Sequence, residues 1–107
     1  MTPTASTRKD LRAFPDAARA RAGYEVFRVQ SGLDPTDWRP LSSIGDGVRE
    51  IRVHTDREHR VIYVAKFAEA VFVLHVFEKK ARKTARKDLD LAHERFRVVM
   101  ADRARRR

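Results

Sequence analysis

Residues 48–77 read VREIRVHTDREHRVIYVAKFAEAVFVLHVF and decide the fold of this chain. The stretch holds three runs rich in Val, Ile, Tyr and Phe, at residues 48–53, 60–66 and 70–77, with short turns near residues 55–58 and 68–69. Such residues favour strands. Connections this short join antiparallel neighbours, because a parallel crossover needs about a dozen residues or more. We therefore expect three consecutive strands in an antiparallel sheet.

Helical patterns precede this stretch. A short helix is predicted from Ser6 or Thr7 to Phe14, after a small, polar and flexible start at residues 1–6. From Asp16 a second helix is indicated by apolar residues at positions i, i+4 and i+7, and Gly32 is placed to end it. The apolar residues at this spacing are Ala20, Tyr24 and Phe27.

A last helix is predicted from about residue 85 to residue 101. Thr84 is a suitable N-cap, and Asp88 and Asp90 suit the positive end of the helix dipole. We expect the arginine-rich end, residues 103–107, to be flexible. The buried side of this helix is marked by apolar residues at helical spacing, which are Leu89, Ala92, Phe96 and Val99.

The order of elements predicts an α+β fold. Two N-terminal helices and a C-terminal helix would pack on one face of a small antiparallel sheet, within one domain spanning residues 1–107. The other face of such a sheet can stay open to solvent or ligand.

The charge balance points to a polyanionic partner. The chain of 107 residues has 24 Lys and Arg against 15 Asp and Glu, a formal charge of +9. This surplus attracts nucleic acid or an acidic protein. The absence of cysteine excludes disulfides, thiolate nucleophiles and iron–sulfur clusters. No long apolar run and no signal peptide are present, so we expect a cytoplasmic protein without a membrane partner.

Side chains that alternate along a strand point to opposite faces of the sheet, so alternation sorts the residues of the predicted strands onto two faces. On the first strand, Ile51 and Val53 share one face, and Glu50 and Arg52 share the opposite face. On the third strand, one set is Phe72, Leu74 and Val76, and the other is Val73, His75 and Phe77. One face is then core. The other gathers a cationic group suited to phosphate, with Phe77 able to stack on a base: Glu50, Arg52, Arg60, His75 and Lys79, with Lys80 at the rim.

Structural roles are the alternative interpretation of the same residues. Glu50 and Arg52 can pair with cross-strand neighbours, His75 can be a buried, hydrogen-bonded histidine, and the lysine run can be a solvated surface. His54, His59 and His93 lack ligand spacing, so neither a metal site nor a cofactor is expected.

Several stretches taken together resemble the successive motifs of HigB-like toxins in the RelE superfamily, in the phage-derived, host-inhibition branch. They are residues 10–15, 37–41, 48–53, 59–63 and 73–80, within a resemblance that covers about residues 6–100. Two departures from the family pattern stand out. Residues 1–6 make a poor strand where the family has an apolar one, and His59 stands where the family has an aromatic residue.

The resemblance implies helices against a curved antiparallel sheet and an endoribonuclease that cuts mRNA on the ribosome. Arg52 and Arg60 match the family's strand arginines, and Phe77, Lys79 and Lys80 match its aromatic-x-Lys-Lys motif. Glu50 and His75 match polar positions beside them. We expect Arg49, Phe77, Arg82 and Lys83 to contact RNA.

The expected reaction is attack of the RNA 2′-hydroxyl on the adjacent phosphate, with His75 or Glu50 as general base. Lys79, Lys80, Arg52 and Arg60 would hold the phosphate. The expected partners are mRNA, the ribosome and a cognate antitoxin with a helix-turn-helix. A catalytically inactive module that binds antitoxin or nucleic acid is the alternative. A DNA-binding regulator is a third, weaker one, because the chain has no helix-turn-helix signature.

Overall fold

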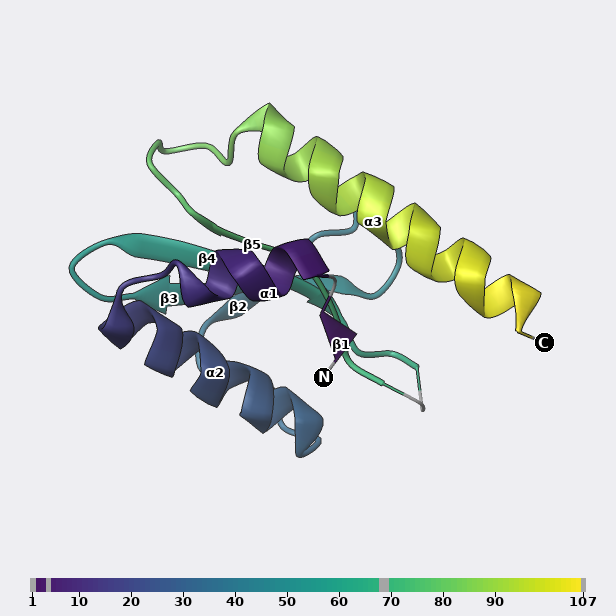
Figure 1. The fold of residues 1–107 in the computed structure, drawn as a ribbon, viewed down its shortest axis with the longest axis horizontal. Coiled ribbons are helices and arrows are strands. Elements are labelled where there is room, and N and C mark those ends of the chain that lie inside the picture. Colours follow the sequence, from purple (N-terminus) through teal and green to yellow (C-terminus); the bar gives the residue numbers. More distant parts are fainter. Residues whose placement is uncertain (1, 4, 68–69, 107) are drawn as a thin grey trace.

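The computed structural model describes residues 2–3, 5–67 and 70–106. Within them, three helices and one five-stranded sheet are present (Figure 1). In chain order the elements are β1 (Thr2–Pro3), α1 (Ala5–Arg12), α2 (Asp16–Gln30), β2 (Trp38–Pro40), β3 (Val48–His54), β4 (Glu58–Val64), β5 (Phe72–Glu78) and α3 (Arg86–Arg105). The strand order across the sheet is β1-β5-β4-β3-β2.

The predicted α+β fold and the antiparallel meander β3–β4–β5 are confirmed. Strand β4 begins two residues earlier than predicted, because Glu58 and His59 already pair with His54 and Val53 across the hairpin. Strand β5 begins later, at Phe72, and extends to Glu78. The turn predicted at residues 68–69 lies outside the described residues.

Two short strands extend the sheet beyond the prediction. Strand β2 pairs antiparallel with β3, and β1 pairs in parallel with β5 at the opposite edge. Strands of two or three residues are too short to show alternation. Each also contains a proline, which sheets tolerate at an edge. The N-terminal segment, which lacks a strand pattern, therefore still supplies an edge strand.

The helices cover both faces of the sheet, so the expectation that they share one face is wrong. Helices α1 and α2 lie on one side, and α3 lies on the other (Figure 1). Phe14, Ala18 and Val26 pack on Ile51 and Val61 in the first core. The second core joins α3 and the residue 41–44 segment to the sheet through Leu41, Ile44, Ile62, Leu74, Phe77 and Ala92.

A β-bulge in β5 changes which residues share a face. Ile62 pairs with His75 and the next residue, Tyr63, pairs with Val73, so Leu74 is the extra residue. Val73 and Val76 therefore both belong to the α1–α2 core, while Leu74 and Phe77 belong to the α3 core. The predicted grouping of Leu74 with Val76, and of Val73 with Phe77, is wrong for this reason.

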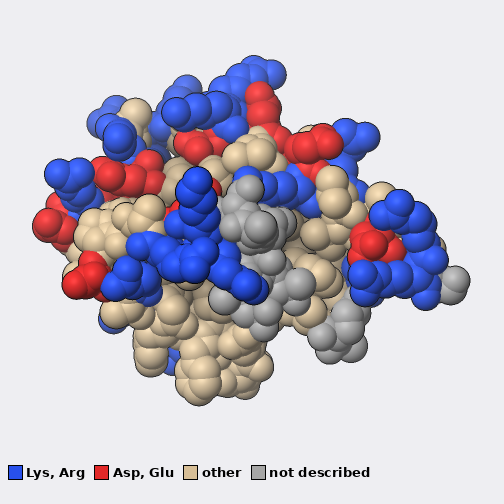
Figure 2. Space-filling model, in the orientation of Figure 1, with Lys and Arg blue, Asp and Glu red and all other residues tan. Residues whose placement is uncertain are grey.

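Helix α2 has the predicted bounds, and Gly32 follows its end with a φ of 83°. Its buried side is Ala18, Ala22, Glu25 and Val26. Two of the residues whose spacing predicted the helix face solvent, since Tyr24 is 50% exposed and Phe27 is 62% exposed. The helical period predicted from these residues is therefore confirmed, but the prediction that they form the buried side of the helix is wrong. Figure 2 shows a mostly uncharged surface in this part of the molecule.

Helix α3 packs through the predicted residues. Ala92 is buried, and Leu89, Phe96 and Val99 pack against the same core. The helix continues to Arg105, beyond the predicted end. The predicted N-cap is wrong. Ala85 precedes the helix without a side-chain cap, and the buried Thr84 hydroxyl has no hydrogen-bond partner among the described residues.

Candidate functional site

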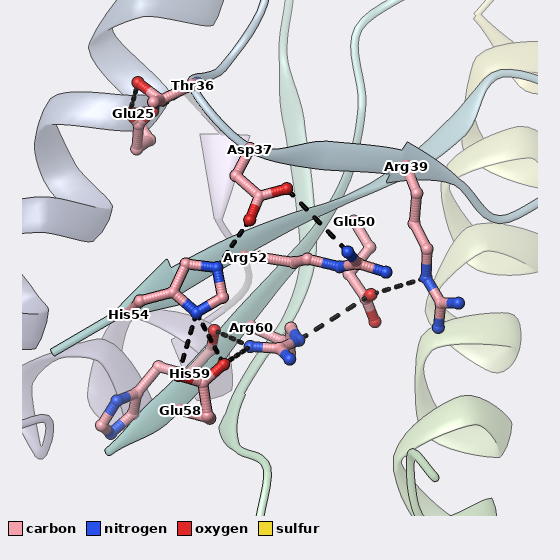
Figure 3. A network of polar contacts seen from close by, with 10 residues as sticks. All are labelled: Glu25, Thr36, Asp37, Arg39, Glu50, Arg52, His54, Glu58, His59 and Arg60. Carbon is pink, nitrogen blue, oxygen red and sulfur yellow. Dashed lines mark hydrogen bonds and ion pairs between the residues drawn. The ribbon is translucent and has the colours of Figure 1, made fainter. Parts of the chain in front are cut away.

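Arg52 and Arg60 lie directly opposite each other on β3 and β4, on the side of the sheet that α3 covers in part (Figure 3). Arg60 is buried, and its Nη1 donates to Glu58 Oε1 at 3.0 Å and to the His59 carbonyl at 3.0 Å. Arg52 is more open, with Nη1 4.0 Å from Asp37 Oδ1. The structure thus brings the two strand arginines together, but only Arg52 can reach outward.

Glu50 lies between two guanidinium groups. Arg39 Nε donates to Glu50 Oε1 at 2.9 Å, and Arg60 Nε lies 3.9 Å from the same oxygen (Figure 3). The Glu50 side chain is only 1% exposed. A buried carboxylate held in this way balances the arginines and orients them. It has no path to a substrate in this arrangement.

His54 closes the β3–β4 hairpin and ties it to the segment before β2. Its Nε2 lies 2.6 Å from Asp37 Oδ2, and its Nδ1 lies 2.8 Å from Glu58 Oε1 (Figure 3). The hydrogen bond to Asp37, followed by that to Glu58, raises the pKa of His54 above its ordinary value of 6.5, although burial opposes this. The hydrogen bond between His54 and Glu58, together with that from Arg60, lowers the pKa of Glu58.

Replacing His54 with Asn is expected to destabilise the protein most at low pH. The folded-state pKa is raised, so the stabilising contribution is complete below pH 6.5 and is lost as the pH rises through the raised pKa. The melting temperatures of both proteins, measured from pH 5.5 upward, should therefore converge. His93→Asn, on the exposed side of α3, is the control. If His93→Asn lowered the melting temperature by the same amount and with the same pH dependence, the stabilising role of the His54 hydrogen bonds would be contradicted.

His75 is buried beneath α3. Its side chain is 6% exposed, and its Nε2 lies 2.8 Å from Asp88 Oδ1. Its Nδ1 lies 3.3 Å from Arg95 Nη1, and its ring stacks on Phe77 with centroids 4.9 Å apart. Of the two interpretations of this histidine, the buried and hydrogen-bonded one describes its surroundings.

An open pocket lies next to Phe77, between the end of β5 and the start of α3. Its volume is about 430 Å³. We call it the lysine pocket; it is lined by Phe77, Glu78, Lys79, Lys80, Ala81, Lys83, Ala85, Lys87 and Asp88. Figure 2 shows Lys and Arg side chains gathered over this end of the molecule. Among the described residues, no carboxylate forms an ion pair with these four lysines.

The predicted site residues therefore fall into separate groups. Phe77, Lys79, Lys80 and Lys83 share the lysine pocket, with Arg82 exposed on the same loop. Arg52, Arg60 and Glu50 form the neighbouring network, where Arg60 lies opposite Phe77. Arg49 points to the other face of the sheet, where it stacks on Trp38 at 4.1 Å and pairs with Asp34.

The sequence analysis did not assign three charged residues of the pocket, Glu78, Lys87 and Asp88, to the site. Lys87 stood out in no pattern, and Asp88 was explained by the helix dipole alone. Lys87 and Asp88 lie in the first turn of α3, three and four residues after Thr84. Their closeness in sequence to the lysine-rich segment was the signal that could have placed them in the site.

Among the residues that the structure describes, no group of three or more His, Asp or Glu side chains is placed to hold a metal ion. None of the described helices combines the length and the apolar character needed to cross a membrane.

Comparison with known proteins identifies a family. No curated protein matches the chain. Residues 9–97 match the family described as phage-derived Gp49-like protein (DUF891), which is most of the sequence. This family is toxin-like and of the RelE kind. The chain therefore belongs to the Gp49-like family of phage-derived, toxin-like proteins.

Proposed function

We propose that the protein is the toxin of a type II toxin–antitoxin system and cleaves mRNA as an endoribonuclease. The observation that carries this proposal is the lysine pocket, which places four lysines around an opening of about 430 Å³ beside the Phe77 ring. Ammonium groups without carboxylate partners suit a phosphodiester. Membership of a toxin-like family supports the same function.

The proposed reaction needs no cofactor, because the RNA supplies its own nucleophile. The 2′-oxygen attacks the adjacent phosphorus, the bond to the 5′-oxygen breaks, and a 2′,3′-cyclic phosphate and a 5′-hydroxyl remain. Lys79 and Lys80 would stabilise the added negative charge on the phosphate. Arg52 would guide the strand, while Glu50 and Arg60 hold the end of the sheet in shape.

The proposed partners follow from the family and the charge. An active nuclease harms its own cell, so a cognate antitoxin, with a helix-turn-helix as in HigB-like systems, would neutralise it. The formal charge of +9 suits an acidic segment of that antitoxin as well as RNA. mRNA on the ribosome is the proposed substrate, by the resemblance to the HigB-like branch.

One observation favours a second function, that of a module that binds antitoxin or nucleic acid without cutting. Both Glu50 and His75, the general bases expected from the sequence, are buried and held by other side chains. Binding through the lysine pocket requires neither group.

Induction of the protein in a bacterial host, followed by mapping of RNA 5′ ends, distinguishes the two functions. The nuclease proposal expects growth arrest and new ends that carry a 5′-hydroxyl within coding sequences. Normal growth and unchanged RNA ends, together with salt-sensitive RNA binding by the purified protein, would favour the binding module instead.

A further inference from the structure

One carboxylate of the lysine pocket, that of Asp88, is held in position by a buried histidine. Asp88, in the first turn of α3, lines the pocket and is 15% exposed. Its Oδ1 lies 2.8 Å from His75 Nε2. In the described part of the chain its other oxygen, Oδ2, accepts no hydrogen bond. One oxygen is thus anchored in the protein, and the other is available to a ligand.

Arg95 determines how His75 holds this carboxylate. Arg95 Nη1 donates to the Leu74 carbonyl at 3.0 Å and lies 3.3 Å from His75 Nδ1. A guanidinium group can only donate hydrogen bonds. Nδ1 must therefore accept, so the ring proton is on Nε2 and is donated to Asp88 Oδ1. The chain Arg95–His75–Asp88 begins at the part-buried guanidinium group of Arg95 on α3 and ends in the pocket.

Glu78 is the other carboxylate of the pocket, and it is held differently. Its Oε2 lies 3.6 Å from Arg57 Nη1, on the hairpin between β3 and β4. No neutral donor within the described residues orients it as His75 orients Asp88. Of the two carboxylates, Asp88 combines a fixed position with an unoccupied oxygen.

We infer that Asp88 is the group that takes the proton from the RNA 2′-hydroxyl, with His75 as its positioning residue. This inference rests on the proposed nuclease function. The 2′-hydroxyl proton moves to Asp88 Oδ2 while the 2′-oxygen forms its bond to phosphorus. The bond from phosphorus to the 5′-oxygen breaks, and that oxygen takes a proton from the ammonium group of Lys79 or Lys80. Water then exchanges the two protons, which restores both groups.

Asp88→Asn tests this role with little change of shape, because the amide oxygen can still accept from His75. Cleavage at saturating RNA should fall about a hundredfold, as expected on loss of a general base. Binding of a substrate with a 2′-deoxy group at the cut site should be unchanged. Asp90→Asn is the matched control, since Asp90 lies on the same helix outside the pocket and pairs with Arg86.

His75→Phe tests the positioning role. It should lower kcat without changing KM, and it should have no further effect in the Asp88→Asn background, whereas a purely structural role would lower activity in both backgrounds. Cleavage by Asp88→Asn at the wild-type rate, or an equal loss of RNA binding, would overturn the inference. Absence of cleavage by the wild-type protein would instead reject the nuclease proposal itself.

Discussion

Replacing Lys79 and Lys80 together by alanine is expected to lower the rate of RNA cleavage about a thousandfold. Both side chains line the lysine pocket, where no carboxylate in the described part of the chain neutralises them. The phosphate gains charge in the transition state, so fixed cations contribute more there than in the bound ground state. Initial rates of mRNA cleavage in a translating extract measure the effect directly.

The matched control removes the same amount of charge elsewhere. Lys9 and Arg12 are exposed on α1, on the other side of the sheet from the pocket. Their double replacement by alanine should leave cleavage within a few-fold of wild type, because only the general attraction for RNA is reduced. If both double variants lost activity equally, the net charge of the protein, and not the pocket, would explain the effect.

Glu50→Ala is expected to destabilise the folded protein by about 3 kcal/mol. The substitution removes a buried carboxylate from between Arg39 and Arg60, and the Arg60 side chain itself is only 7% exposed. Within the described residues, Arg60 would then keep Glu58 alone as an ion-pair partner, and loss of a carboxylate beside a buried charge is far more costly than a broken surface pair. Urea denaturation at neutral pH, with the slope of the transition checked for constancy, measures the difference.

An exposed ion pair serves as the comparison. Glu94 and Arg97 pair at 2.9 Å on the outer side of α3, with both side chains largely exposed. Glu94→Ala should therefore cost less than about 1 kcal/mol. A similarly small loss for Glu50→Ala would show that water reaches the arginines and that Glu50 does not control their arrangement.

Local patterns predicted the elements of this fold well. Three strands and the helices from Asp16 and near residue 85 follow from composition and spacing that the folded chain keeps. The side chosen by each element was less predictable. Tyr24 and Phe27 show a correct helical period on the solvent side, because small residues, Ala18 and Ala22, allow α2 to approach the sheet closely.

The candidate site was predicted only in part, because burial by a distant element does not show in the pattern of a strand. Arg52 and Arg60 were expected on one face of the sheet, and they lie opposite each other. Phe77, Lys79 and Lys80, which the family resemblance grouped as one motif, share the lysine pocket. Whether a side chain on that face is open depends on where α3 lies across it, and no strand pattern contains this information. His75 and Glu50 were therefore expected at an open surface and are buried.

The loop of residues 79–85 connects a strand to a helix that is anchored further along, at Leu89 and Ala92. Its length can therefore change without disturbing the packing of either element. Insertions or deletions there would widen or narrow the entrance to the lysine pocket. The size of the pocket entrance can in this way change while the framework of the fold stays the same.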